Sequence, residues 1–314
     1  MNPEVVAVLG GGAWGTLLAE LIRRNGHPVQ VWSRRYGGEL APVVQPATMV
    51  VVAVSVAGVL PLVQQLPHLA PGTIIVSTTK GLLPDSCSTP TQVWQRAFPE
   101  HGVVAVSGPN LAAEIAQGLP AATVAASVQT WAAQRVQRVL ASERFRVYTN
   151  QDPLGTELGG ALKNVMAIAA GVCDGLHLGA NAKAGLVTRA LAEMVRVAVE
   201  WGAQATTLYG LSGLGDLLAT CNSPLSRNYR LGYGLAQGKS VAAMLQELQS
   251  TVEGINTTQV VVQWADRRGI AVPIAQQVYQ LLQGRVTPQQ AVGALMERDL
   301  KAEFATDWPR YPLS

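Results

Sequence analysis

The chain has 314 residues, with 48% hydrophobic and 14% charged side chains and a formal net charge of +3. This length and composition allow a large buried core and suggest about two domains. The lysines and arginines are scattered, which argues against a nucleic-acid partner and is compatible with an anionic small molecule. The three cysteines form no Cys-x-x-Cys pair, so we expect neither a disulfide framework nor a metal site.

Membrane insertion and export are not expected from the sequence. The densest apolar run, Met49 to Val54, is much shorter than the roughly 20 residues of a membrane-spanning helix. The N-terminus carries Glu4 and leads into an apolar run typical of a first strand rather than of a signal peptide. We therefore expect a cytoplasmic protein.

The apolar run Val5–Leu9 predicts a strand, and Gly-x-Gly-x-x-Gly follows it at Gly10, Gly12 and Gly15. A helix is predicted over Ala13–Arg24, so the last of these glycines lies in its first turn. This order of strand, tight turn and helix is typical of a dinucleotide-binding site. Gly10 would permit the turn, Gly12 would let the backbone approach a pyrophosphate, and Gly15 would let helix and strand pack closely. The phosphates would then lie at the helix N-terminus, where free N–H groups favour an anion.

Further strands and helices alternate through the first half of the chain. Strands are predicted at Val29–Trp32, Met49–Val54, Thr73–Ser77, Val103–Val106, Ala122–Ala126 and Phe145–Tyr148, with a helix at Thr130–Leu140. After about Asn150, helices are predicted at Gly155–Cys173, Lys183–Trp201, Val241–Gln249, Thr257–Arg268, Ile274–Gln283 and Pro288–Met296. The fold class is therefore α/β: a Rossmann-type parallel sheet over residues 1–149, then an all-helical domain over residues 150–314. The tail from Lys301 onward is expected to be a loose end.

The residues after the second predicted strand bear on the choice of cofactor. An NAD site usually has Asp or Glu there to bind the ribose 2′-hydroxyl, whereas this chain has Ser33, Arg34 and Arg35. A hydroxyl and two guanidinium groups suit a 2′-phosphate, because arginine forms paired, charge-assisted hydrogen bonds with phosphate oxygens. We therefore expect NADP(H) to be preferred, with NAD(H) as the alternative. In the other reading, both arginines are solvated surface charges.

Lys163 and Asn164 lie within the otherwise apolar helix predicted at Gly155–Cys173. Lysine is rarely buried unless it is paired or functional, and burial lowers its pKa toward values useful for proton transfer. The alternative is that Lys163 points to solvent from the rim of its helix. Asp216 follows a glycine-rich turn, and this pattern fits a helix N-cap as well as a catalytic carboxylate.

Two further groups are candidates for holding an anionic substrate. Ser226, Arg227 and Asn228 place a hydroxyl, a guanidinium and an amide in a row, which suits phosphate oxygens. Lys80 follows the strand predicted at Thr73–Ser77, at the carboxyl end where open α/β sheets bind ligands. We therefore treat all four as candidate substrate residues.

Together these segments resemble the bacterial NAD(P)-dependent glycerol-3-phosphate dehydrogenase family, from about residue 4 to about residue 296. The resemblance is carried in chain order by Gly-Gly-Gly-Ala-Trp-Gly-Thr (10–16), Thr-Thr-Lys-Gly (78–81), Ser-Gly-Pro-Asn-Leu-Ala-Ala-Glu (107–114), Gly-Gly-Ala-Leu-Lys-Asn-Val (159–165), Gly-Ala-Asn-Ala-Lys-Ala-Gly-Leu (179–186), Gly-Leu-Gly-Asp-Leu (213–217), Ser-Arg-Asn (226–228) and Val-Glu-Gly (252–254). So many motifs in order are far more specific than the glycine motif alone.

The resemblance implies interconversion of dihydroxyacetone phosphate and sn-glycerol 3-phosphate with NAD(P)H, which supplies glycerophospholipid synthesis. It implies that Lys163 donates and accepts the proton and that Asp216 and Asn164 lie around the substrate. Asp216 would then hold the ammonium, and Asn164 would bind a substrate hydroxyl or carbonyl. The other residues that match family positions around the substrate are Lys80, Gly108, Asn110, Thr220, Ser226, Arg227 and Asn228. The residues that match family positions around the cofactor are Ala13, Trp14, Arg34, Lys80, Ala112, Arg227, Thr251 and Glu253. Members are often dimeric, so we expect a homodimer.

The sequence departs from the family pattern in two places. After Ser33 and Arg34, only Arg35–Thr48 remain before the third predicted strand, so a helix and a strand that members usually have there are missing. Because the first half is shortened, the sequence does not determine the strand order or the residues at one edge of the adenosine pocket. Asn110 stands where many members have Thr.

Two other functions remain open at this point. Another NADP-dependent dehydrogenase with a helical second domain would act on a β-hydroxy acid or on ketopantoate, and its site would bind a carboxylate rather than a phosphate. A non-catalytic NADP(H) sensor would bind the nucleotide without turnover, and it would need no lysine within an apolar helix.

Overall fold

The computed structural model describes residues 3–249, 251–300 and 302–303. Within these residues, seven short strands rich in valine and alanine form one sheet with the order β2-β1-β3-β4-β5-β6-β7. The strands are β1 (Val6–Leu9), β2 (Val29–Trp32), β3 (Met49–Val52), β4 (Ile74–Ser77), β5 (Gly102–Ser107), β6 (Ala121–Ala126) and β7 (Phe145–Asn150). All seven predicted strands are therefore present, with ends that differ by at most two residues.

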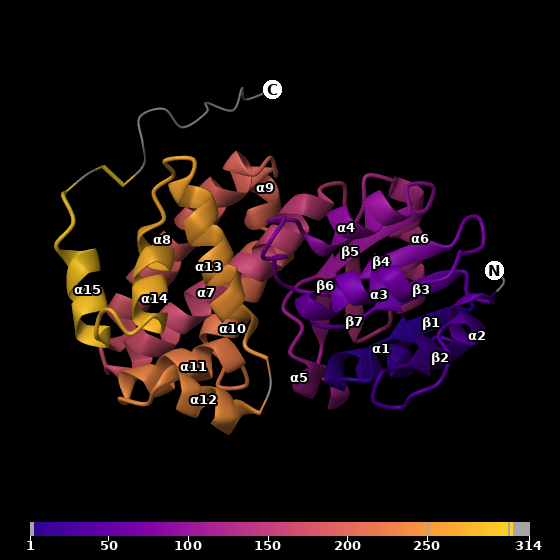
Figure 1. Cartoon of the computed structure of the whole chain (residues 1–314), viewed down its shortest axis with the longest axis horizontal. Coiled ribbons are helices and arrows are strands. Elements are labelled where there is room, and N and C mark those ends of the chain that lie inside the picture. The colour runs from indigo at the N-terminus through magenta and orange to yellow at the C-terminus, as the bar shows by residue number, and fades with distance from the viewer. Residues whose placement is uncertain (1–2, 250, 301, 304–314) are drawn as a thin grey trace.

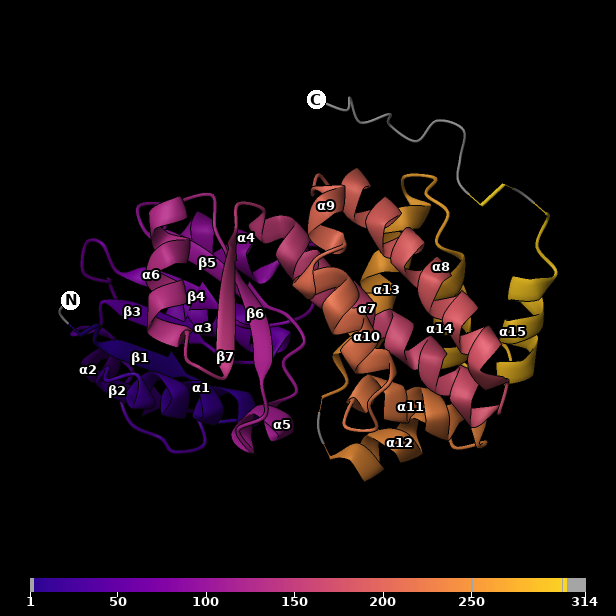
Figure 2. The same ribbon diagram turned by 180° about the vertical axis from the view of Figure 1, so that it is seen from behind.

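Alternate side chains of the strands pack into two different cores, so helices cover both faces of the sheet. In β1, Val6 and Val8 belong to one core, while Ala7 and Leu9 belong to the other. The helices on the first face are α1 (Ala13–Arg24), α5 (Ala112–Ala116) and α6 (Thr130–Leu140). The second face carries α2 (Ala41–Val44), the 3₁₀ turn η1 (Val56–Gly58), α3 (Val59–Gln65) and α4 (Pro90–Ala97). Figure 2 shows α6 in front of the sheet and α5 below β6.

The shortened first half has a simple structural outcome. The four-residue helix α2 is the only helix or strand between β2 and β3, and β2 becomes the edge strand beside β1. β3 pairs with β1 on its other side, with Val6 opposite both Val29 and Met49. The strand order that the sequence left open is thus β2-β1-β3, and the nucleotide turn keeps its neighbours on both sides.

One detail of the predicted parallel sheet is wrong, because β6 runs antiparallel to β5 and only then pairs in parallel with β7. The connection from β5 to β6 contains the five-residue helix α5 and no longer crossover helix. A parallel return needs a longer crossover that carries the chain back to the opposite edge of the sheet. β6 therefore starts beside the carboxyl end of β5 and runs back along it.

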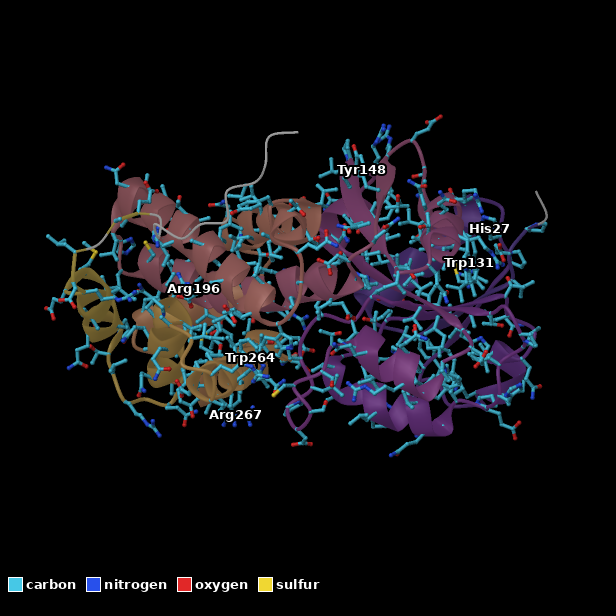
Figure 3. All side chains as sticks on the ribbon, turned by 90° about the horizontal axis from the view of Figure 1, so that it is seen from above. His27, Trp131, Tyr148, Arg196, Trp264 and Arg267 are labelled. Carbon is cyan, nitrogen blue, oxygen red and sulfur yellow. The ribbon has the colours of Figure 1, made fainter. Side chains whose placement is uncertain are left out.

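The second half of the described chain consists of helices around one central helix, α7 (Figure 1). α7 (Pro153–Gly175) is buried from Gly155 to Cys173 except for the half-buried Ala169. The surrounding elements are α8 (Gly179–Glu200), α9 (Ala205–Leu208), the π-helical turn η2 (Leu211–Gly215), α10 (Asp216–Cys221), α11 (Arg227–Ala236), α12 (Val241–Leu248), α13 (Glu253–Asp266), α14 (Pro273–Leu282) and α15 (Pro288–Met296). In Figure 3, Trp264 and Arg267 lie in this helical half, and Trp131 lies in the sheet half.

Glycines bring α11 unusually close to α7. A Cβ on Gly232 would lie 1.9 Å from the Ile168 carbonyl oxygen, and a Cβ on Gly171 would lie 2.1 Å from the Tyr229 carbonyl oxygen. Only glycine permits backbones to approach this closely. The crossing positions the first turn of α11 beside the middle of α7, where Asn164 lies.

Among the described residues, no helix is both long and apolar enough to cross a membrane. The expectation of a loose tail concerns residues that lie almost entirely outside the described part of the chain.

Candidate active site

The glycine turn between β1 and α1 brings the backbone close to a potential ligand. Gly10 has φ +134°, a conformation that side chains disfavour, and a Cβ there would lie 2.3 Å from the Ala53 carbonyl oxygen. A Cβ on Gly15 would lie 2.0 Å from the Gly10 carbonyl oxygen, so α1 packs on β1 only with glycine there. Gly12 is the N-cap of α1, and a Cβ on it would meet no atom within 4 Å. The turn therefore fits a pyrophosphate beside a helix N-terminus that carries no acidic side chain in its first turn.

The end of β2 presents positive charge next to this turn. Ser33 Oγ accepts a hydrogen bond from the backbone N–H of Arg35 at 3.2 Å. Arg34 and Arg35 are exposed, and no carboxylate in the described part of the chain forms an ion pair with either. Tyr36 was not among the predicted residues, yet its ring lies so close to Gly11 that a Cβ there would be 2.8 Å from Tyr36 Cε2. Its place directly after two candidate arginines was the available signal.

Three ionisable side chains from separate segments meet where the sheet half touches the helical half. Lys163 Nζ of α7 lies 3.1 Å from Asp216 Oδ1 and donates to Thr220 Oγ1 at 2.6 Å. Lys80, which follows β4, forms an ion pair with the other oxygen of Asp216 and donates to the Gly108 carbonyl at 3.0 Å. The Thr220 hydroxyl donates to Asp216 Oδ1 at 3.2 Å. One carboxylate thus holds an amine from each half of the molecule.

Burial sets the charge states of this cluster. Lys163 is 7% exposed and Asp216 is 2% exposed. Burial lowers the pKa of Lys163 to about 8, while the Asp216 carboxylate acts to raise it and the Lys80 charge acts to lower it. Burial also acts to raise the pKa of Asp216, but the charges of Lys163 and Lys80 outweigh it and hold that pKa below its ordinary value. At neutral pH the carboxylate is ionised, and Lys163 is a cation that can give up its proton.

The sequence left two alternatives open: Lys163 could point to solvent, and Asp216 could cap a helix. Lys163 is buried rather than turned to solvent. Asp216 is the first residue of α10, and the N-cap position belongs to Gly215. Its carboxylate therefore faces the two lysines rather than capping the helix.

A chain of amide contacts lies beside the lysine cluster. The side-chain amide of Asn228 donates to Asn164 Oδ1 at 2.9 Å, and the backbone N–H of Gly254 donates to Asn228 Oδ1 at 3.0 Å. These residues come from α7, α11 and α13, so the contacts join three helices next to Lys163. Gly254 was not predicted as a site residue, although it closes the Val-Glu-Gly motif at 252–254.

The predicted phosphate group is arranged around the start of α11. Ser226 is the N-cap, and its hydroxyl accepts from the Tyr229 backbone N–H at 3.2 Å. Arg227 is the first residue of the helix and is exposed. Glu253 is half-buried at the start of α13; burial raises the pKa of its carboxyl, and the charge of Arg227 opposes that rise. Thr251 is exposed just before α13.

The remaining predicted positions lie in the sheet half. Asn110 donates to Thr123 Oγ1 at 2.8 Å, and its Oδ1 is buried without a hydrogen-bond partner in the described part of the chain. Ala112 begins α5, which packs beside α1, and Ala13 and Trp14 form the start of α1. The structure thus brings Lys80, Lys163 and Thr220 together on Asp216, and it pairs Asn164 with Asn228. In the described part of the chain, no hydrogen bond or ion pair joins Asn110, Ser226 or Arg227 to Asp216.

A cavity of about 550 Å³ lies elsewhere, among α7, α8, α14 and α15. Its lining is mainly apolar, with Arg196 among the polar exceptions (Figure 3). None of the predicted site residues lines it. The candidate site therefore depends on converging polar side chains at the junction of the halves and not on this cavity.

Comparison with family models assigns the chain. Residues 152–293 match the model described as NAD-dependent glycerol-3-phosphate dehydrogenase C-terminus, and residues 5–39 and 36–133 match the corresponding N-terminus. The chain belongs to this family. The N-terminal match is divided at residues 36–39, within the shortened segment between β2 and β3.

Individual relatives agree with the family. A protein from Nostoc sp. (strain PCC 7120), named glycerol-3-phosphate dehydrogenase [NAD(P)+], is 58% identical over 306 residues, which cover 97% of this chain and 100% of the relative. A protein of the same name from Synechocystis sp. is 57% identical over 96% of each chain. The crystal structure of glycerol-3-phosphate dehydrogenase from Coxiella burnetii superposes with a TM-score of 0.87 at 33% identity, covering 94% of this chain and 99% of that chain. The expected family, fold class and NAD(P) dependence are therefore confirmed.

Proposed function

We propose that this chain interconverts dihydroxyacetone phosphate and sn-glycerol 3-phosphate with NAD(P)H, and that Lys163 moves the proton on the substrate oxygen. The observation that carries the proposal is the Lys163 amine, which is buried, 3.1 Å from Asp216 and at the junction of the two halves. The relatives at 57–58% identity are named for this activity. In the family, this reaction supplies glycerophospholipid synthesis.

When bound, NAD(P)H supplies the hydride for the ketone carbon. Negative charge then develops on the former carbonyl oxygen, where a protonated Lys163 stabilises it and donates its proton. In the reverse direction, the neutral amine accepts the proton from the hydroxyl. Asp216 holds the amine in place from one side and Thr220 from the other.

The amide of Asn164 is oriented to serve the same substrate. Its Oδ1 accepts from Asn228, while its Nδ2 makes, within the described residues, only a long contact of 3.4 Å to the Gly160 carbonyl. That Nδ2 is therefore the group we assign to a substrate hydroxyl or carbonyl oxygen. Because consecutive side chains of a helix point about 100° apart, Asn164 and Lys163 would approach the substrate from different directions.

The phosphate is assigned to the start of α11. Arg227 is an exposed guanidinium on the first turn of a ten-residue helix, where free backbone N–H groups also favour an anion. Lys80 and the Ser226–Asn228 segment complete the proposed phosphate and substrate contacts. Binding energy from the phosphate would orient the reacting carbon, so substrates without it would lose kcat/KM.

For the cofactor, we propose a preference for NADP(H) over NAD(H). The turn at Gly10, Gly12 and Gly15 would hold the pyrophosphate. Ser33, Arg34 and Arg35 would hold the 2′-phosphate, because the two guanidinium groups are exposed and no carboxylate in the described residues competes for them.

The proposal also covers the division into domains, the cellular compartment and the oligomeric state. Residues 1–149 would bind the nucleotide and residues 150–314 would supply the substrate groups, a division supported by the end of β7 at Asn150 and the start of α7 at Pro153. The protein would be a cytoplasmic homodimer, as the family resemblance suggests. Sedimentation equilibrium would then give twice the chain mass of 33.1 kDa, and a mass of one chain would reject the dimer.

One absorbance assay tests the function. Oxidation of NADPH is followed after addition of dihydroxyacetone phosphate, ketopantoate or phosphate-free dihydroxyacetone, and the series is repeated with NADH. We expect turnover with dihydroxyacetone phosphate, a higher kcat/KM with NADPH, and a large loss without the phosphate. Turnover of ketopantoate alone would support the rival dehydrogenase, and NADPH binding without any turnover would support the sensor. A higher kcat/KM with NADH would reverse the cofactor preference.

A further inference from the structure

Glu157 is a second ionisable residue buried in α7, six residues before Lys163, and the proposed reaction does not use it. It is 5% exposed. No lysine, arginine or histidine in the described part of the chain forms an ion pair with its carboxylate. A buried carboxylate without a countercharge is costly, so its presence inside a nearly all-apolar helix calls for an explanation.

The carboxylate of Glu157 reaches across the junction into the sheet half. The backbone N–H of Thr91 donates to Glu157 Oε1 at 2.9 Å and to Oε2 at 3.2 Å. The Thr91 hydroxyl donates to Oε2 as well. Thr91 is the second residue of α4, so Glu157 satisfies a helix-terminal N–H that has no partner within its own helix.

This contact ties together the two segments that carry the lysines. α4 follows β4 through one connection, and that connection contains Lys80 and Leu82, whose side chain is buried in the core of the helical half. Glu157 and Lys163 are about 9 Å apart along the axis of α7. The position of α7 relative to the start of α4 therefore sets where Lys163 stands relative to Lys80, and both must reach Asp216.

We propose that Glu157 is a positioning residue, which holds α7 against the start of α4 so that Lys163 and Lys80 meet on the same carboxylate. It touches neither substrate nor cofactor, and it acts through the placement of Lys163. The inference rests on the proposed role of Lys163 as the acid–base group. Burial raises the pKa of Glu157 to about 7, which agrees with a group kept there for its hydrogen bonds rather than for its charge.

The test compares two substitutions at this position. Glu157→Leu has a similar size but no acceptor, so the Thr91 N–H and hydroxyl lose their partner and α7 is no longer tied. We expect kcat for dihydroxyacetone phosphate reduction to fall about tenfold to a hundredfold, the cost of a small misplacement of a catalytic group, with little change in KM for NADPH. As Lys163 moves from Asp216, its pKa falls, and the basic limb of the kcat–pH profile shifts to lower pH. Glu157→Gln keeps an acceptor for the N–H and a donor for the hydroxyl, so it should retain most of kcat.

Glu193 supplies a matched control. It is also buried, and its carboxylate accepts from the backbone N–H groups of Ile274 and Ala275 at 2.9 Å, at the start of α14. Glu193→Leu should lower the melting temperature and leave kcat and the pH profile of the folded enzyme unchanged. If Glu157→Leu behaves in the same way, the positioning role is rejected.

A second variant tests the positioning role of Glu157 if Glu157→Leu does not fold. Thr91→Val removes the hydroxyl and keeps the backbone N–H, and we expect a smaller loss of kcat with the same direction of pH shift. An unchanged kcat and pH profile in Thr91→Val would then overturn the inference. Normal activity in the Glu157 and Thr91 variants, with loss in Lys163→Ala, would reject this role alone, whereas activity in Lys163→Ala would reject the proposed function itself.

Discussion

Lys163 is suited to proton transfer because of where its amine is held. An ordinary lysine keeps its proton to about pH 10, which makes it a poor base at neutral pH. Burial in α7 brings the pKa of Lys163 down to about 8, and the Asp216 carboxylate prevents a larger fall. The residue can therefore stabilise a developing alkoxide as a cation and also accept a proton as a neutral amine.

This placement predicts opposite pH dependence in the two directions. Reduction of dihydroxyacetone phosphate needs protonated Lys163, so kcat should fall as the pH rises through about 8. Oxidation of glycerol 3-phosphate needs the neutral amine, so its kcat should rise through the same range. Measurement of kcat from pH 6 to 10 in both directions checks the sign. A reduction rate that stays flat across that interval would contradict the assignment.

Arg227→Ala should mainly raise KM for dihydroxyacetone phosphate, by about tenfold or more, because a charge-assisted contact to phosphate is lost. The activity toward phosphate-free dihydroxyacetone should change much less, because that substrate has no phosphate for Arg227 to bind. Arg230→Ala is the matched control, since Arg230 lies one turn further along α11 and pairs with Glu247 at 3.6 Å. An unchanged KM in Arg227→Ala would remove Arg227 from the phosphate site.

At the scale of elements, the contact between α7 and α11 aligns the amides with the lysine cluster. The two backbones touch at Gly171 and Gly232, and this close approach brings Asn228 to within 2.9 Å of Asn164. A wider separation of the helices would break that hydrogen bond. The glycines are therefore part of the site, although they carry no functional group.

Gly232→Ala should separate α7 from α11, because the new Cβ would lie 1.9 Å from the Ile168 carbonyl oxygen. We expect a loss of about 1–3 kcal/mol in the free energy of unfolding and a raised KM for dihydroxyacetone phosphate. Urea denaturation and steady-state kinetics measure the two effects. Gly185→Ala in α8 is the control, since its Cβ would meet no atom within 4 Å and alanine favours the helix. Equal stability of the two variants would argue against the close contact.

The same contact explains why one long helix, α11, was not predicted from the sequence. Strands such as Val29–Trp32 and helices such as Thr130–Leu140 follow from local patterns and have the predicted ends. α11 was not predicted because Gly232 and Gly234 interrupt its apolar spacing, and glycine disfavours helices. Gly232 serves a contact with α7, about 60 residues earlier in the sequence, and Gly234 lies against Met244 of α12. Local periodicity contains no information about the contact with α7.

At the scale of the whole molecule, the site is assembled from both halves. Lys80 and Gly108 come from the sheet half, and Lys163, Asp216 and Thr220 come from the helical half. Sequence motifs identified these residues individually, but their meeting on one carboxylate depends on the packing of α7 against the sheet half. Glu157 illustrates the gap: it is a charged residue in the same apolar helix as Lys163, and its partner Thr91 is visible only in three dimensions.

At this scale, the short connection between β2 and β3 contains none of the candidate substrate residues. β2 simply becomes the sheet edge, and the glycine turn, the lysine cluster and the start of α11 all lie on other segments. The match to the Nostoc protein takes in the whole of that relative and 97% of this chain.

The most direct test of this account is kcat for Lys163→Ala with saturating NADPH and dihydroxyacetone phosphate. Lys239→Ala serves as the control, since Lys239 is an exposed lysine whose amine pairs with Glu247 away from the site. Loss of both the acid and the charge that stabilises the alkoxide should lower kcat at least about a thousandfold, while the control stays near the wild-type value. Retention of more than about a tenth of the wild-type kcat in Lys163→Ala would contradict the assignment, because general acid catalysis alone is worth at least about a hundredfold.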